Sequence, residues 1–362
     1  MFHSTRQNRT YEVLSEAGVD CLVCFDAVSS RWLTGFSGST GVVVVNAQAG
    51  TTTLIVDPRY TVSVRAEVDS WGDPTVVVEA DTSVDSYGVI KNSASGRVGV
   101  VASRVTLAQA NALGKVGVEV NELDTDPLLR LRLVKDQDEI ANMRTALAAA
   151  EQGFIAAEDM LNNPGATEIN VRSALESAML GAGATEVGFP TIVASGPNSL
   201  SPHATPTDRT IRDGEFVIID FGGAINGYKS DSARTLWRGE LSEQQIEVYE
   251  TVRQALEVST SVIAPGATYG QVKEAADKVL NEAGYGEYIL HPFGHNIGLD
   301  THERPYFSEH DPDASLEMQQ GNIVALEPAV YVPDVGGVRV ENLILVTADG
   351  CEVMNTLPVR SP

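Results

Sequence analysis

The sequence predicts an α+β protein with a small N-terminal α/β domain, residues 1–125, and a larger domain, residues 130–362, built around a central antiparallel sheet. Three observations predict this class. The chain of 362 residues is long enough for two hydrophobic cores. Short β-type runs alternate with helical stretches from about residue 11 to residue 122. After residue 130, a helix–helix–hairpin pattern occurs twice, which indicates an internal duplication with pseudo-twofold symmetry.

The N-terminal region is expected to form a sheet of short strands. The acidic, proline-containing segment 121–127 is the expected domain boundary. Cys21 and Cys24 form a C-x-x-C pair, but residues three apart on a strand point to opposite faces, and the chain has only three cysteines. We therefore interpret them as buried core thiols and expect no disulfide framework. The predicted strands are Cys21–Phe25, Gly41–Val45, Thr52–Val56, Thr75–Val78 and Val98–Val101.

Two helix pairs are predicted in the second domain. Asp136 and Glu139 form a D-x-x-E capping box that begins a long helix. The remaining signals follow in this order along the chain: a break at Pro164-Gly165, a helix from about Thr167 to Gly181, a cap at Ser242 and Gln245, a break at Pro265-Gly266, and a helix from about Tyr269 to Gly284.

Composition excludes several classes of function. The formal net charge of −24 disfavours nucleic-acid binding, because a polyanion would be repelled. No apolar run approaches the roughly 20 residues that a bilayer span needs, and residues 1–9 lack the apolar core of a secretion signal. We therefore expect a cytoplasmic protein that binds neither nucleic acid nor a membrane.

One predicted hairpin brings two aspartates together. Asn226-Gly227, between two β runs, is a strong two-residue turn signal. This turn places Asp220 opposite Ala233, and Asp231 two residues from Ala233 on the same face. The two aspartates are then diagonal neighbours with Cβ atoms about 7–8 Å apart, a spacing that suits a pair of cations. The alternative is that both are solvated turn and strand residues.

Three of the six histidines lie within twelve residues, at His291, His295 and His302. A single histidine is more often a structural residue, but three in one glycine-punctuated stretch favour a site. Gly294 and Gly298 would let the backbone approach a neighbour closely, with substrate as the candidate neighbour.

Two further segments carry candidate site residues. Glu327 and Glu341 lie in β runs on either side of a Pro/Gly turn, so they can face each other across a second hairpin, and Arg339 shares a face with Glu341. The turn-rich loop 194–203 ends in His203, and such a loop can place an imidazole over a site. Taken alone, each glutamate and the loop could equally be ordinary surface features.

Together these residues suit a two-metal centre. Facing carboxylates repel one another unless cations lie between them. One imidazole among several carboxylates, without a thiolate, favours a divalent ion of the manganese, cobalt or zinc kind. The candidate ligands are Asp220, Asp231, His295, Glu327 and Glu341.

The same segments resemble the pita-bread metallopeptidases, which include methionine aminopeptidase, aminopeptidase P and prolidase. The blocks IIDFG, SDSART, GHNIGLDTHE, LEPAVY and RVEN resemble the five metal-ligand blocks in the family's order. SGPNSLSPH resembles the block that carries a substrate-side histidine. In the N-terminal region, WLTGFSGSTG and DPRY resemble the extra domain of the prolidase, aminopeptidase P and creatinase branch. Creatinase replaces metal ligands, whereas all five are present here.

The resemblance implies a role for each candidate. It assigns Asp220 to one metal, His295 and Glu327 to the other, and Asp231 and Glu341 to both. It places His203 and His302 beside the substrate as catalytic groups with Glu327, and His291 beside the proline ring. Tyr331 and Arg339 would also contact substrate. The substrate's C-terminal carboxylate would need a cation, either Arg339 or an arginine of a partner subunit. The implied cofactors are two divalent ions, Mn²⁺ first and Co²⁺ or Zn²⁺ as alternatives.

The implied reaction is hydrolysis of the peptide bond before proline in Xaa-Pro dipeptides. Water activated by the two metals would attack the scissile carbonyl, with Glu327 as general base. The alternative is an Xaa-Pro aminopeptidase that acts on longer peptides, and a third reading is a catalytically silent binding protein. Pro292-Phe293 and Thr301 depart from the family's usual residues at the substrate rim, so the preferred substrate stays open. The resemblance also implies a homodimer.

Overall fold

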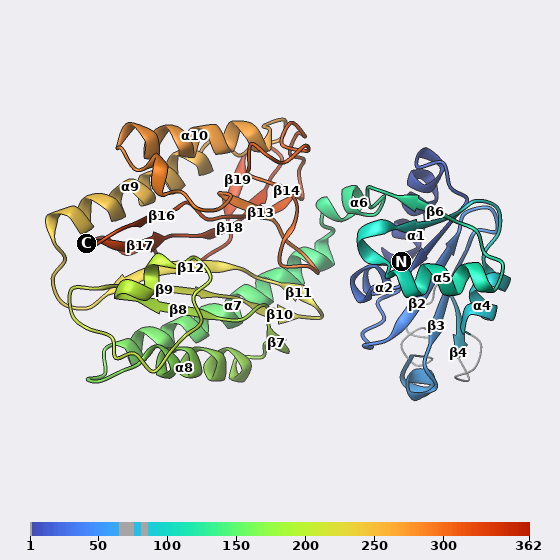
Figure 1. Ribbon diagram of the computed structural model, residues 1–362, viewed down its shortest axis with the longest axis horizontal. Coiled ribbons are helices and arrows are strands. Elements are labelled where there is room, and N and C mark those ends of the chain that lie inside the picture. Colours follow the sequence, from blue (N-terminus) through green and yellow to red (C-terminus); the bar gives the residue numbers. More distant parts are fainter. Residues whose placement is uncertain (1, 65–75, 81–85) are drawn as a thin grey trace. The chain divides into compact units, whose positions relative to one another are not determined.

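Two units make up the fold, Met1–Arg132 and Leu133–Pro362. The computed structural model describes residues 2–64, 76–80 and 86–362 (Figure 1). The expected boundary segment, 121–127, lies a few residues before this division and contains the end of a strand, β6 (Val120–Leu123). Sequence reasoning missed β6 because it pairs only with β5, at the edge of the sheet, and its two central residues are exposed and polar.

The first unit contains a six-stranded mixed sheet in the order β4-β3-β2-β1-β5-β6. The two pairings β1–β2 and β2–β3 are antiparallel, and the other three are parallel. Its strands are β1 (Cys21–Cys24), β2 (Gly41–Asn46), β3 (Thr51–Val56), β4 (Val76–Ala80), β5 (Val98–Val101) and β6. Its helices are α1 (Phe2–Glu16), α2 (Ala27–Thr34), α4 (Ser86–Ser93), α5 (Leu107–Lys115) and α6 (Leu129–Leu133), which ends at the division, with short 3₁₀ turns at Pro58–Tyr60 and Ala102–Arg104.

The predicted strands of this unit are present. All five form within one or two residues of their expected bounds, and Thr75, expected to begin the fourth, lies outside the described residues. Cys21 and Cys24 are 0% and 4% exposed and unbonded to each other, which confirms them as core thiols. Both can be buried because β1 is a central strand, flanked by β2 and β5.

The second unit begins with the predicted helix pairs. Asp136 and Glu139 form the expected capping box, as do Ser242 and Gln245. The structure adds two boxes of the same kind, at Thr167 and Thr268. Each box satisfies backbone donors that the first helical turn leaves free, so each helix begins where its cap stands. The helices are α7 (Gln137–Leu161), α8 (Glu168–Gly181), α9 (Glu243–Thr260) and α10 (Tyr269–Glu282), with short 3₁₀ turns η3 (Gly196–Leu200) and η4 (Gly286–Tyr288).

Every strand pairing in the second unit is antiparallel among the described residues. The first half contributes β7 (Glu186–Val187), β8 (Ile192–Ser195), β9 (Phe216–Phe221), β10 (Gly223–Ile225), β11 (Tyr228–Lys229) and β12 (Ser232–Trp237). The second half contributes β13 (Gly294–Asn296), β14 (Glu303–Tyr306), β15 (Ile323–Leu326), β16 (Ala329–Val332), β17 (Gly336–Arg339), β18 (Asn342–Val346) and β19 (Cys351–Val353).

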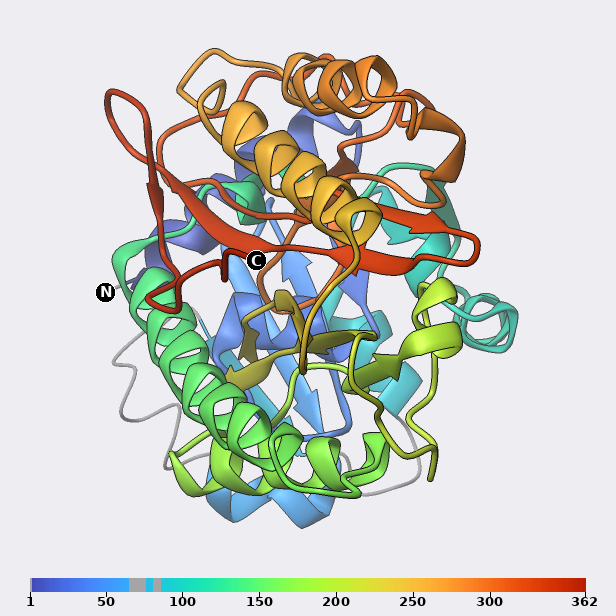
Figure 2. The same cartoon turned by 90° about the vertical axis from the view of Figure 1, so that its left-hand side faces the viewer.

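The two halves of this unit repeat one plan. In Figure 2, the green helices α7 and α8 and the orange helices α9 and α10 lie on opposite sides of the strands. One apolar cluster joins α7 and α8 to β9 through residues such as Phe154, Leu175 and Ile219. A second joins α9 and α10 to β15 and β18 through residues such as Val252 and Val324. The predicted helix–helix–hairpin duplication is therefore present, with one core on each side of the strands.

The predicted hairpin register is confirmed. Asn226 and Gly227 have φ angles of 49° and 77°, which the two central residues of a type I′ turn require. Ile225 pairs with Tyr228, and Asp220 lies opposite Ala233.

The two halves meet along β12. The Glu341 N–H donates to the Ala233 carbonyl at 2.9 Å. Thr235 Oγ1 donates to the Arg339 carbonyl at 2.8 Å and accepts from the Arg339 N–H at 2.9 Å. These bonds bring Glu341 and Arg339 of the second half against the hairpin that carries the two aspartates.

Candidate active site

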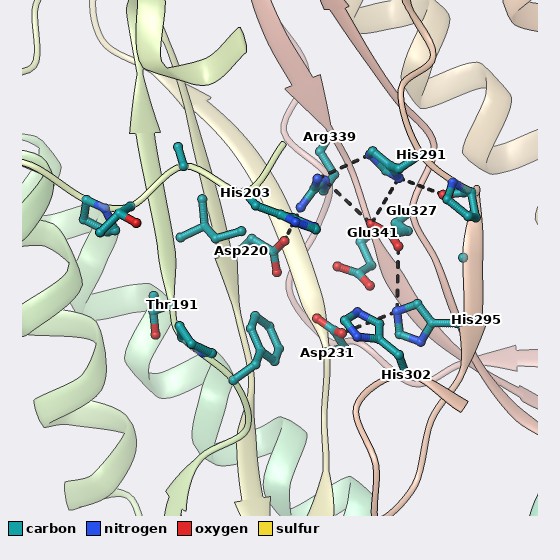
Figure 3. A pocket seen from close by; sticks show the side chains of 18 of the residues that line it. Thr191, His203, Asp220, Asp231, His291, His295, His302, Glu327, Arg339 and Glu341 are labelled. Carbon is teal, nitrogen blue, oxygen red and sulfur yellow. Dashed lines mark hydrogen bonds and ion pairs between the residues drawn. The ribbon is translucent and has the colours of Figure 1, made fainter. Parts of the chain in front are cut away.

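A cavity of about 620 Å³ opens in the second unit, and both halves line it. Figure 3 shows its labelled acidic and histidine side chains facing a common space, with Thr191 on another wall. Nine of the ten residues predicted for the site line this cavity: Asp220, Asp231, His295, Glu327, Glu341, His203, His291, His302 and Arg339. The tenth, Tyr331, does not.

The five predicted ligands form two overlapping groups. Ligand atoms of Asp220, Asp231 and Glu341 lie within 4.8 Å of one another, and so do those of His295, Glu327 and Glu341. A third group joins Asp231 and His295 to His302 by the same criterion. Glu341 therefore belongs to both of the first two groups. Asp231 belongs to the group with Asp220 and to the group with His295.

Burial raises the proton affinity of these carboxylates. Desolvation raises the pKa of Asp231 and of Glu341 well above their ordinary values, and the neighbouring carboxylates add to both shifts. Desolvation also raises the pKa of Glu327, to about 7. The pKa of Asp220 is raised by burial although Arg339 opposes the shift. The fold thus brings four carboxylates together, and they cannot all ionise readily unless a positive charge lies among them.

Several oxygens in the cluster lack a hydrogen-bond donor among the described residues. Both side-chain oxygens of Glu341 and Oδ1 of Asp220 are buried and accept no hydrogen bond. Buried polar atoms are normally paired, so such orphaned oxygens mark a place where another partner binds. Oxygen-rich donors with one imidazole fit hard or borderline divalent cations, so the residues present suit the implied metal centre.

His295 is oriented for ligation by its own backbone neighbour. Its Nδ1 lies 3.0 Å from the Asn296 carbonyl, which can only accept, so Nδ1 carries the proton and Nε2 keeps its lone pair. Nε2 lies 3.7 Å from both Asp231 Oδ2 and Glu327 Oε1. Burial, with His302 next in effect, lowers the pKa of His295 to about 3, which keeps the imidazole neutral. Asn296 is itself fixed by Tyr269 and by the Pro305 carbonyl.

Arg339 is held by the protein on several sides. Its Nη1 forms an ion pair with Asp220 Oδ2. Its Nη2 donates to the Tyr331 hydroxyl at 2.7 Å and to the Pro202 carbonyl at 3.1 Å. The Tyr331 hydroxyl also lies 2.8 Å from Nε2 of His291, and Tyr331 is only 4% exposed. The structure therefore places Tyr331 behind Arg339 and His291, where it supports them.

His203 and His302 are open to the cavity, in contrast to the buried His295. The His302 ring stands edge-on to that of His295, with centroids 4.4 Å apart. Burial lowers the pKa of His302, while nearby Asp220 opposes the shift. His291 is largely desolvated, and burial and Arg339 lower its pKa to about 3.

The loop that carries His203 is tied down by Glu168, a residue that sequence reasoning missed. Glu168 is 0% exposed and begins α8. Its Oε1 accepts from the Ser195 N–H at 2.8 Å and hydroxyl at 2.7 Å, at the start of the loop. Its Oε2 accepts from the Thr207 N–H at 2.9 Å and hydroxyl at 2.7 Å, after the loop. Asn198, within the loop, donates to both oxygens. One buried carboxylate thus fixes both ends of the His203 loop.

The glycines of the histidine segment allow a close backbone approach, as expected, and the nearest neighbours are other parts of the protein, while Gly294 also lines the cavity. Gly294 has φ of 149°, and a Cβ there would lie 2.0 Å from the Ala325 carbonyl oxygen on β15. A Cβ on Gly298 would meet Lys135 and Glu303. Gly294 is needed so that β13 can pair closely with β15, which holds His295 in register.

Helix α8 and its neighbours form a wall that the sequence did not reveal. Residues of this wall include Arg172, Glu176, Phe189, Thr191 and Ile192. Val171, Leu175 and Met179 form the apolar stripe of α8, and Arg172 and Glu176 stand one position beyond it. That offset predicts half-burial, but periodicity alone cannot say that this helix borders a site.

Residues 141–348 match the model of metallopeptidase family M24, and residues 6–134 match the creatinase/prolidase N-terminal domain. A probable dipeptidase, PepE, of Mycobacterium bovis is 38% identical over 283 residues, covering 76% of this chain and 72% of that protein.

Two solved structures share the whole architecture. The Xaa-Pro dipeptidase from Bacillus anthracis superposes with a TM-score of 0.91 at 29% identity, covering 99% of each chain. The X-Pro aminopeptidase from Thermotoga maritima gives 0.85 at 29% identity, covering 97% of this chain and 98% of that one. The expected α+β fold, a creatinase-type domain followed by a pita-bread domain, is thereby confirmed.

These matches identify the protein as a peptidase that uses divalent metal ions. In the described residues, no helix combines the length and apolar character that a membrane span requires. The match to the family model covers more than half of the chain, which is enough to assign the chain to that family. The chain belongs to metallopeptidase family M24 and carries the creatinase/prolidase N-terminal domain.

Proposed function

We propose that this metallopeptidase hydrolyses the peptide bond before proline in Xaa-Pro dipeptides. The observation that carries the proposal is the cluster of five buried or half-buried ligand candidates in one cavity with three histidines. The similarity to a whole-length Xaa-Pro dipeptidase supports the substrate class. The catalytic part would be residues 130–362, preceded by the N-terminal domain of residues 1–125.

We assign the ligands as the sequence resemblance implied. Asp231 and Glu341 would bridge two divalent ions, Asp220 would bind one, and His295 and Glu327 the other. The overlapping groups of ligand atoms around Glu341 support this arrangement. When bound, the ions would polarise the scissile carbonyl and lower the pKa of a water molecule. We propose Mn²⁺ as the native metal, with Co²⁺ and Zn²⁺ as alternatives.

The protein's own residues would handle the proton and the oxyanion. A Glu327 oxygen would take the proton of the attacking water as general base, since Glu327 lies in the same ligand group as His295 and Glu341. His203 and His302, both open to the cavity, would donate N–H groups to the developing oxyanion. His291 would line the side of the cavity that receives the proline ring.

Arg339 would act through other residues and not on the substrate's carboxylate. Its ion pair with Asp220 and its bonds to Tyr331 and Pro202 engage both Nη atoms, and its Nε lies 3.6 Å from Glu327 Oε2. Such contacts orient Asp220 and support His291, which lies 3.3 Å from Arg339 Nη2. We therefore replace the expected substrate contact of Arg339, and that of Tyr331 behind it, with positioning roles.

The decisive experiment compares Ala-Pro with Ala-Pro-Ala as substrates of the purified protein, with and without added Mn²⁺. A dipeptidase cleaves Ala-Pro in preference and loses activity in EDTA. Equal or faster cleavage of Ala-Pro-Ala would favour the second candidate, an Xaa-Pro aminopeptidase, which the similarity to the Thermotoga maritima enzyme supports. Absence of bound metal, with no peptidase activity at all, would favour a catalytically silent protein.

We also propose that the enzyme is a cytoplasmic homodimer. The net charge of −24 suits a protein that stays dissolved and away from nucleic acid. Sedimentation of the purified protein would distinguish a dimer from a monomer.

A further inference from the structure

We propose that Arg172 of α8 binds the C-terminal carboxylate of the dipeptide. This inference rests on the proposed function and names the group that recognises the far end of the substrate. A dipeptide has a positive amino terminus and a negative carboxyl terminus. The acidic cluster suits the first, so the second requires a cation on another wall of the same cavity.

Arg172 is a cation of the cavity wall that pairs with none of the described residues. Among the described residues, two arginines line the cavity, Arg172 and Arg339. Arg339 is held by Asp220, Tyr331 and Pro202, and its Nε lies 3.6 Å from Glu327. The guanidinium of Arg172 forms no hydrogen bond or ion pair with any residue that the structure describes, and its Nε is buried. A buried donor without an acceptor is costly, so a carboxylate ligand would supply what the fold leaves unsatisfied.

The distance along the wall suits a dipeptide. His203 and Asp220 line the same cavity, and residues 203–206 continue its wall from there. Three residues of extended chain span at most about 10 Å, and a dipeptide spans about 7 Å. Thr207 is bound to Glu168, one helical turn of about 5.4 Å before Arg172. The long Arg172 side chain can therefore meet the end of a dipeptide whose scissile bond lies at the acidic cluster.

Glu176, a second charged residue of this wall, should weaken the binding of a carboxylate by Arg172. It also lines the cavity, one turn beyond Arg172 on the same face of α8, yet no ion pair joins the two. Its negative charge opposes a bound carboxylate. Arg172 and Glu176 should therefore affect the binding of a free acid in opposite directions.

The test compares Ala-Pro with its C-terminal amide, Ala-Pro-NH₂, in the metal-loaded enzyme. The wild type should show a KM for the acid well below that for the amide. In Arg172→Met, the KM for the acid should rise roughly tenfold to a hundredfold. The KM for the amide should change by less than about twofold, and kcat should change little. Arg172→Lys keeps the charge but loses the bidentate geometry. Its KM for the acid should therefore lie between those of the wild type and Arg172→Met.

Two further variants serve as controls. Glu176→Gln removes the opposing charge from the same wall, so the KM for the acid should fall while that for the amide stays unchanged. Arg144→Met removes an arginine of α7 that pairs with Glu352 outside the cavity, and it should leave both KM values unchanged. Thermal unfolding of each variant checks that folding is intact.

Two results would overturn the assignment. One is an Arg172→Met variant that still prefers the acid as strongly as the wild type, since the carboxylate then binds elsewhere. The other is an equal loss of acid and amide binding, since the side chain then acts only through packing. A wild type that cleaves neither peptide nor any other Xaa-Pro substrate refutes the proposed function itself, which is a different outcome.

Discussion

Arg339 of β17 forms an ion pair with Asp220 of β9, and both side chains are buried. The pair joins the two halves of the second unit at the acidic cluster. Asp220 keeps a second oxygen, Oδ1, without a hydrogen bond among the described residues. One oxygen is thus held by the protein, and the other is available for a metal.

Replacing Arg339 with Met should destabilise the protein and reduce catalysis. Asp220 would be left as a buried carboxylate without its partner, which costs about 3–5 kcal/mol, and Tyr331 and Pro202 would lose a donor. Urea unfolding of the metal-free protein measures the first effect and kcat/KM the second. Arg253→Met, which breaks a surface pair with Glu250, should change stability by less than about 1 kcal/mol. Equal small effects in both variants would refute a positioning role for Arg339.

Replacing Glu341 with Gln should separate stability from metal binding. The substitution removes one charge from a buried cluster of carboxylates, so the metal-free protein should become more stable at pH 7.5. The same change removes a proposed bridging ligand, so metal per chain should drop and activity should fall at least about a hundredfold. Metal analysis by mass spectrometry and a thermal melt give the two readings. Full metal content together with full activity would show that Glu341 does not bridge.

Metal removal should make stability depend on pH between about 6.5 and 8. The folded pKa of Glu327 is raised from 4.5 to about 7, and those of Asp231 and Glu341 are raised well above their ordinary values. An acidic group whose pKa is higher in the folded than in the unfolded state stabilises the fold at low pH. This stabilisation is lost as the pH rises through the folded pKa. The Tm of EDTA-treated protein should therefore decrease from pH 6.5 to 8, and Mn²⁺ should abolish the decrease.

The chosen pH window avoids an opposing effect. His291 and His295 have folded pKa values lowered to about 3, so they reduce stability only as pH falls below their unfolded value of 6.5. As the pH rises above that value, these imidazoles become mostly neutral in either state, and so does His302, whose folded pKa is also lowered. The carboxylates then dominate the pH dependence. A Tm that rises with pH in the metal-free protein would contradict the burial of these charges.

Glu168→Gln should impair catalysis through the His203 loop. Gln keeps one acceptor but places an amide donor against groups that donate, so about 1–3 kcal/mol of stability should be lost. Activity should fall about tenfold, and the effect should vanish in a His203→Ala background, because a shared pathway makes the two changes non-additive. A full additive loss would mean that Glu168 acts independently of His203.

Glu151 provides a matched comparison for Glu168. It is also buried, accepts from the N–H and hydroxyl of Thr356 and from the Leu357 N–H, and does not line the cavity. Glu151→Gln should lose similar stability with kcat/KM nearly unchanged. Equal catalytic losses in the two variants would assign both glutamates a purely structural role.

Local chemistry explains why much of the site could be predicted from the sequence. Asn226-Gly227 admits few turns, and that turn sets which residues of β9 and β12 oppose each other, so Asp220 and Ala233 could be paired in advance. The capping boxes of α7 and α9 likewise depend on residues three apart in the chain. In these cases the deciding contacts are local, and the sequence was sufficient.

The contacts between distant segments could not be obtained in this way. The sequence by itself determined the two-domain α+β class, the hairpin register and the set of candidate ligands. Only the tertiary structure decided that Arg339 pairs with Asp220, that Tyr331 lies behind the cavity, and that Arg172 lines its wall. Periodicity indicates which side of a helix or strand is buried, whereas the partner that a buried charge meets depends on how separate elements pack together.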